Sequence, residues 1–136
     1  MDPLLVVSSP QRAIVQAGAT LSSRKLDWLI LLNNGFFIHD GFFTPLEDGL
    51  FEVNMALVSF LMASSPTVYT VSLTALRADS HVTLASADVL QRQPRQILQA
   101  VWRVQLLAGD QASLEIHVEG DTTAFNSLVL CVRDMT

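Results

Sequence analysis

One stretch of the sequence decides how the rest is interpreted: Asp40-Gly-Phe-Phe-Thr-Pro-Leu-Glu-Asp-Gly-Leu-Phe-Glu-Val53. Asp40-Gly41 and Asp48-Gly49 are turn dipeptides, because glycine reaches positive φ without a Cβ clash and aspartate can hydrogen-bond its own backbone two residues on. Pro45 lacks an N–H group and therefore belongs at the end of a strand. The stretch thus predicts turn chemistry between runs that form β-strands.

The composition predicts a single domain that carries too little charge to cover its surface. A chain of 136 residues can remove roughly 68–70% of its extended-chain surface from water around one core. Half of the residues are hydrophobic but only 15% are charged, where about 25% is usual. We interpret this deficit as a sign of oligomerisation. Mean hydropathy is +0.38. No window offers the roughly 18 uninterrupted apolar residues of a spanning helix, so we expect no membrane insertion.

The charge and cysteine content exclude several classes of function. Net charge is −5, and the eight lysine and arginine residues are scattered from Arg12 to Arg133, which argues against nucleic-acid binding. Cys131 is the only cysteine, which excludes an internal disulfide and a thiolate metal cluster and predicts a buried, inert thiol. The first residues show no signal peptide, so a leader was either removed or never present.

Two segments alternate apolar and polar residues with the period of a β-strand that has one wet face. Residues Tyr69, Val71, Leu73 and Ala75 share one side of 67–76, and Ala112, Leu114, Ile116 and Val118 share one side of 112–119. We expect further strands at 12–17, 36–38, 50–62, 82–87, 97–107 and 125–134, and either a helix or a strand at 26–32. Between them we expect a hairpin turn at 33–35, a break at 64–66, a polar loop at 91–95 and a turn at Gly109-Asp110. Residues 1–11 should be a flexible lead-in to one domain at 12–136. The pattern predicts an all-β antiparallel sandwich or jelly roll.

Three of the expected strands, 50–62, 97–107 and 125–132, are apolar on both faces. A sandwich explains this if its inner sheet packs on the core with one face and on another subunit with the other. The alternative is a covering element within the same chain. If Phe51 faces the core, Glu52 and Asn54 face the neighbouring subunit and could fix its register; the alternative for Glu52 is a solvated rim.

Several residue groups carry a resemblance to a known family. They are Gly41-x-Phe43-Thr44, Gly49-Leu50-Phe51-x-Val53, the turn at Gly109-Asp110, and the closing segment 123–130 with Phe125. At these positions the chain resembles the globular head of complement component 1q and its relatives. That family shares a jelly roll of about ten strands and a trimeric assembly with tumour necrosis factor ligands. Ser127 stands where the family has a glycine. The resemblance spans about residues 12–133.

The resemblance implies a homotrimeric, non-enzymatic recognition module at an extracellular or particle surface, which binds a protein receptor or a glycan through its loops. The expected trimer interface comprises Leu50, Glu52, Asn54, Ala56, Val58, Leu128 and Leu130. A tumour necrosis factor-like cytokine ligand and a viral or bacterial surface structural protein remain as alternatives. The residues named for the family likeness are therefore expected to be structural rather than catalytic.

The sequence offers no catalytic or metal-binding constellation. His39, His81 and His117 lie in different segments without the spacing of a zinc site. We expect no cofactor. Calcium is the one cation with candidate ligands, because some relatives of the family bind it and loop carboxylates suit its chemistry. The candidates are Asp40, Asp48, Asp79 and Asp88, but their spacing forms no known calcium loop, and solvated surface charge is the better interpretation.

Overall fold

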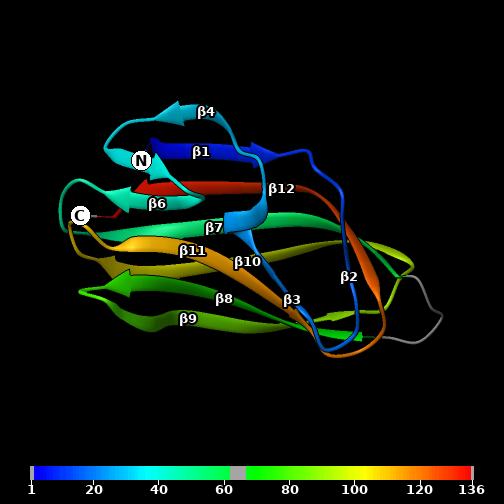
Figure 1. Ribbon diagram of the computed structural model, residues 1–136. Helices are drawn as coiled ribbons and strands as arrows, with labels where there is room; N and C mark the ends of the chain where they lie inside the picture. Colours follow the sequence, from blue (N-terminus) through cyan, green and yellow to red (C-terminus); the bar gives the residue numbers. More distant parts are fainter. Residues whose placement is uncertain (1, 62–66, 136) are drawn as a thin grey trace.

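The computed structural model describes residues 2–61 and 67–135, which form two antiparallel β-sheets packed face to face (Figure 1). In chain order the elements are β1 (Pro3–Ser9), β2 (Ala13–Val15), β3 (Thr20–Ser22), a short 3-10 helix η1 (Ser23–Lys25), β4 (Leu29–Asn33), β5 (Phe36–His39), β6 (Phe42–Pro45), β7 (Gly49–Leu61), β8 (Thr67–Arg77), β9 (Ser80–Gln91), β10 (Arg95–Leu106), β11 (Gln111–Val118) and β12 (Thr123–Asp134). Within the described residues, no helix is long and apolar enough to cross a bilayer.

The chain passes repeatedly from one sheet to the other, as it does in a jelly roll. The first sheet has the order β10-β7-β12-β1-β4, with β2 paired to β12. The second has the order β5-β6-β11-β8-β9, with β3 paired to β11. Figure 1 shows β1, β7 and β12 in one layer and β8, β9 and β11 in the other. The predicted all-β antiparallel sandwich is confirmed.

The core lies between the sheets and is built from residues that alternate along the long strands. Tyr69, Val71 and Leu73 of β8 are fully buried, and Ala112, Leu114, Ile116 and Val118 of the neighbouring strand β11 lie beside them on the same face of the second sheet. In β7, Phe51, Val53 and Met55 point into the same core. The predicted inward faces of all three strands are therefore confirmed.

The turn at Asp40-Gly41 has the geometry that its sequence predicts. It joins β5 to β6, with His39 paired to Phe42, and φ is 52° at Asp40 and 75° at Gly41. Positive φ at both central residues is what a type I′ hairpin turn requires. Gly41 also lies against η1, because a Cβ there would overlap the Arg24 Cα. The turn and η1 are thus packed backbone to backbone.

Replacing Gly41 with alanine should destabilise the fold more than the same change at Gly18. Both glycines have positive φ, but a Cβ at Gly18 would meet nothing within 4 Å. Gly18→Ala should therefore cost only the backbone strain, about 1–2 kcal/mol. Gly41→Ala adds an overlap with backbone atoms, and we expect a further loss of about 2 kcal/mol or more. Urea unfolding of both variants measures the difference, and equal losses would contradict the close approach.

Three expectations about other segments are wrong. Residues 1–11 are not a loose lead-in, because Pro3–Ser9 forms β1 between β12 and β4, with Leu5 and Val7 buried in the core. The segment 33–35 is not a hairpin, because β4 and β5 belong to different sheets. Gly49 does not have positive φ; a Cβ there would approach the Phe51 ring to 3.0 Å.

The remaining expectations concern single segments. The choice of helix or strand at 26–32 is decided in favour of strand β4. The Gly109-Asp110 turn is present between β10 and β11, with φ of 87° at Gly109 and a hydrogen bond from the Asp110 N–H to the Leu107 carbonyl. The expected break at 64–66 lies outside the described residues.

Candidate functional site

The face of the first sheet that points away from the core carries exposed apolar side chains on neighbouring strands. We call it the outer face; its residues are Leu50, Glu52, Asn54, Ala56 and Val58 of β7, Ile97, Gln99, Val101 and Arg103 of β10, and Val129 and Cys131 of β12. Ile97 is 68% exposed and Val101 49%. Strand pairing sets Ile97 beside Val58 and Val129 beside Ala56, so the apolar groups are continuous across the sheet.

Polar groups form one row across this face. Glu52 lies between Arg103 and Arg133, with a distance of 3.9 Å from Oε2 to Arg103 Nε and 3.6 Å from Oε1 to Arg133 Nη1. Arg133 Nε is buried and has no hydrogen-bond partner among the described residues. The row of Arg103, Glu52 and Arg133 therefore combines one carboxylate with two guanidinium groups. Beside this row, Asn54 Oδ1 accepts a hydrogen bond of 3.3 Å from Gln99 Nε2.

Leu128 and Leu130 do not lie on the outer face, which corrects the expected interface. Both are buried in the core together with Phe125. A β-bulge shifts the register of β12 between Asn126 and Val129, and Ser127 takes a φ of 58° there. The extra residue reverses which side chains point outward. Val129 and Cys131 take the outer positions instead, so the Cys131 thiol is only partly buried.

The edge strand β4 extends the apolar surface beyond the outer face. All five of its residues are exposed, and four of them are the consecutive apolar residues Leu29, Ile30, Leu31 and Leu32. A long exposed apolar edge is a template for association with another chain. Sequence reasoning missed this role because the segment was ambiguous between helix and strand.

The residues that carry the family resemblance lie in the scaffold. Phe36 of β5 packs its ring edge on Phe51 at a centroid distance of 5.6 Å and contacts Phe43 at 6.4 Å. Phe125 packs on Tyr69 at 5.4 Å. Gly41, Gly49 and Gly109 lie at turns or strand starts, Thr44 lies in β6, and Val53 and Asp110 are buried. These positions lie in the scaffold, and two of them, Gly41 and Phe43, line one small apolar hollow.

Asp110 is a buried carboxylate held by one arginine. Arg77 donates to it from Nε at 3.0 Å and from Nη2 at 2.8 Å, and the Leu107 N–H donates at 2.8 Å. Burial opposes the ionisation of Asp110, but these hydrogen bonds and the charge of Arg77 outweigh it and lower the pKa of Asp110. The same pairing raises the pKa of Arg77. The pair ties the end of β8 to the β10–β11 turn.

Acid should weaken the protein partly through Asp110. Because its folded pKa lies below the unfolded value of about 3.9, its contribution to stability is complete above that pH and is lost as pH falls through the folded pKa. We expect Asp110→Asn to reduce stability by about 2 kcal/mol near pH 6. The difference in unfolding free energy between this variant and the unsubstituted protein should become smaller below about pH 4. Urea unfolding across this pH range measures it; a gap independent of pH would contradict the charged role.

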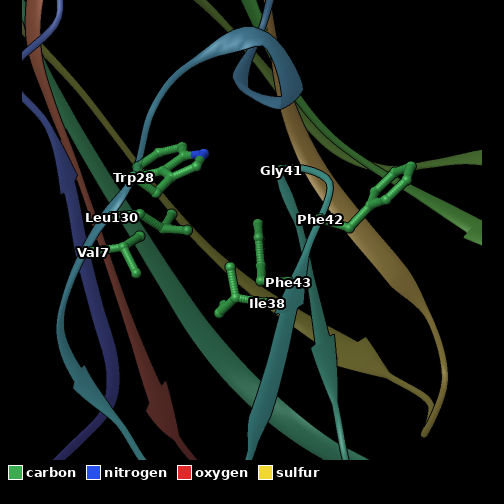
Figure 2. Close-up of a pocket in the computed structure, with 7 residues that line it drawn as sticks. All are labelled: Val7, Trp28, Ile38, Gly41, Phe42, Phe43 and Leu130. Carbon is green, nitrogen blue, oxygen red and sulfur yellow. The ribbon is translucent and has the colours of Figure 1, made fainter.

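A narrow apolar hollow lies between the two sheets (Figure 2). It is lined by Val7, Trp28, Ile38, Gly41, Phe42, Phe43 and Leu130. Its volume is about 10 Å³, and its walls are almost entirely apolar. Such a space holds at most one water and offers that water few partners. We therefore interpret it as a packing gap. Figure 2 also shows Phe42 turned away from Phe43, toward the solvent side of β6.

The histidines and the candidate calcium ligands are dispersed. His39 lies 3.1 Å from Asp40, His81 lies 3.7 Å from Glu115, and His117 contacts Thr20. Among residues 2–61 and 67–135, no group of three or more His, Cys, Asp or Glu side chains could hold a metal ion. Asp48 and Asp88 already accept hydrogen bonds from the Ala108 N–H and the Thr70 hydroxyl.

Comparisons with known proteins show the fold. No family model and no curated protein matches the sequence. The globular domain of zebrafish complement 1qA protein has a TM-score of 0.66 and 16% identity, over 99% of this chain and 98% of that chain. The Eiger TNF of S. frugiperda has a TM-score of 0.63 and 11% identity, over 99% of this chain and 94% of that chain. The resemblance to the heads of both families is therefore confirmed for the fold.

Proposed function

We propose that the protein is a non-enzymatic homotrimeric recognition module whose outer face forms the contact between subunits. Its loops would bind a protein receptor or a glycan at an extracellular or particle surface. The observation that carries the proposal is the apolar patch of the outer face, on which Ile97, Val101 and Val129 are exposed in the single chain. The fold shared with the two structural neighbours supports the type of module.

The energetics require an interface larger than the outer face alone. At about 25 cal/mol per Å², covering the remaining exposed area of Leu50, Ile97, Val101 and Val129 yields about 1 kcal/mol per side chain. Loss of translational and rotational freedom costs an estimated 4–15 kcal/mol. The exposed apolar residues of β4 supply further area at the same sheet. We therefore include β4 in the proposed interface.

The polar row would give this interface its register. The side chains of Arg103 and Arg133 remain partly exposed beside the single carboxylate of Glu52. A carbonyl or carboxylate of a neighbouring subunit would accept hydrogen bonds from these guanidinium groups. Because such a contact forms in only one alignment, it would select one packing over others of similar apolar area.

Sedimentation equilibrium tests the proposed assembly directly. A trimer has three times the 14.9 kDa mass of one chain. We expect this mass at micromolar concentration, with little change when salt is raised, since the contact is mainly apolar. A stable monomer would refute the proposal, and a stable dimer would refute its three-fold form.

A further inference from the structure

A second hollow lies on the solvent side of the second sheet, away from the outer face. Its volume is about 440 Å³, within the range of sites that bind small molecules. The residues that line it are Ser22, Arg24, Lys25, Phe42, Leu76, His81, Ser113 and Glu115. We call it the η1 hollow. It is assembled from η1 and strands β3, β6, β8, β9 and β11, and the proposed trimer contact leaves this face of the sandwich open.

Two cations stand on its rim without a carboxylate partner. Arg24-Lys25 is the only adjacent basic pair in a chain of net charge −5, and Lys25 is its only lysine. Both residues are exposed, and neither forms an ion pair with another described residue. Their combined field favours an anion at the η1 side of the hollow.

The position of Arg24 is fixed by its neighbours. Its guanidinium lies 4.1 Å from the ring centroid of Phe42, and its Nε donates to the Asp40 carbonyl at 3.5 Å. The contact of Gly41 with the Arg24 backbone holds η1 against the same hairpin. Among the described residues the terminal nitrogens of Arg24 have no acceptor. They are therefore held in place and available to a carboxylate, which guanidinium groups bind through paired hydrogen bonds.

The floor of the hollow offers different chemistry. Glu115 and the nearly buried Ser113 of β11 present oxygen atoms, and the Ser113 hydroxyl lies 3.2 Å from that of Thr74. His81 lies 3.7 Å from Glu115, too far for a short hydrogen bond, so the carboxylate of Glu115 keeps free acceptor capacity. Phe42 and Leu76 add apolar surface between the two polar regions.

We propose that the η1 hollow binds an acidic sugar, that is, a single ring bearing both a carboxylate and hydroxyl groups. Arg24 and Lys25 bind the carboxylate. Glu115 and Ser113 bind hydroxyls at the other end of the ring, and its C–H face lies on Phe42. A sulfate or phosphate dianion fits less well, because Glu115 repels a second negative charge in so small a space.

This assignment deepens the proposed recognition function, because it names the glycan class. One ring in a shallow site should bind with millimolar affinity. Three copies of the hollow on a trimer would bind a polymer of such sugars far more tightly through multivalency, without further contacts. The monomeric sugar therefore suits a test of the hollow itself, and the polymer tests the assembly.

The test is a titration of the full chain with D-glucuronate, followed by backbone amide NMR. D-glucose serves as the neutral match and acetate as the carboxylate alone. We expect shifts at Lys25, Ser113 and Glu115 with a millimolar dissociation constant, and weaker binding of both controls. Arg24→Gln with Lys25→Gln should weaken glucuronate binding at least about tenfold. Arg92→Gln, an exposed arginine at the far end of β9 from His81, should leave it unchanged.

Three outcomes would overturn the inference: glucose or acetate binding as tightly as glucuronate, shifts that avoid the η1 hollow, or the same affinity in the double variant. Dispersed amide spectra show that each variant is folded. Sedimentation of the unsubstituted protein separates this result from the proposed function. A trimer that does not bind glucuronate refutes only the hollow, whereas a monomer that binds it refutes only the assembly.

Discussion

Val129→Asp should convert the protein from a trimer into a folded monomer. Val129 is 38% exposed in the single chain and lies beside Ala56 near the middle of the outer face. In the monomer an aspartate there reaches water and costs little. In the trimer three copies would be buried against apolar neighbours, and burial of an unpaired charge costs several kcal/mol for each copy. Sedimentation equilibrium should show the 14.9 kDa chain mass alone.

Val68→Asp is the matched control for this substitution. Val68 is also 38% exposed, but it lies on β8 in the second sheet. The same change of residue therefore adds the same charge and removes the same side chain on the opposite side of the sandwich. We expect Val68→Asp to remain trimeric. Circular dichroism should show β-structure in both variants. If both variants keep the mass of the unsubstituted protein, the outer face is not the subunit contact.

The strands that the sequence predicts well are those with one face toward the core and the other toward solvent. Residues 67–76 and 112–119 alternate because one side of β8 and β11 faces water while the other fills the core. Asp40-Gly41 is equally clear, because few residue pairs accept positive φ at two successive positions. In these places the local preference and the tertiary environment agree.

The sequence is silent where both faces of a strand are apolar. In β1 neither set of alternate side chains is polar, so the strand does not show the apolar–polar alternation of a half-buried strand. Pro3 and the run Ser8-Ser9-Pro10 also resemble a break between elements. In 128–132 every residue is apolar or cysteine, so the pattern cannot tell which set points inward. The bulge at Ser127 sets that choice, and only the pairing with β7 reveals it. For this reason the sequence predicts the wrong face for Leu128 and Leu130.

The η1 hollow shows a second limit of sequence reasoning. Its residues come from six elements, and strand pairing brings Ser22 beside Glu115 and His81 beside Leu76. Arg24-Lys25 is visible in the sequence as an adjacent basic pair, yet nothing local indicates that Phe42 lies beneath Arg24. Long-range pairing creates the site, so its chemistry appears only in the folded chain.

Phe51→Asp should prevent folding rather than alter assembly or binding. Phe51 is buried at the start of β7, where its ring packs on Phe36 and would lie 3.0 Å from a Cβ at Gly49. Removing a buried phenylalanine ring costs about 3–5 kcal/mol. Burying an aspartate in its place adds several more, or forces that side chain to take up a proton. The sum is comparable to the whole stability of a domain, about 5–15 kcal/mol.

Two further variants test whether the effect of Phe51→Asp depends on the face of β7 that is changed or only on a change in this part of the strand. Leu50→Asp changes the adjacent residue, whose side chain points to the outer face, so it should fold but weaken the trimer. Phe51→Leu keeps an apolar side chain in the core and should fold with a loss of about 1–2 kcal/mol. Circular dichroism and urea unfolding measure all three. A folded Phe51→Asp protein that lacks binding would place Phe51 at a functional surface and contradict its role in the core.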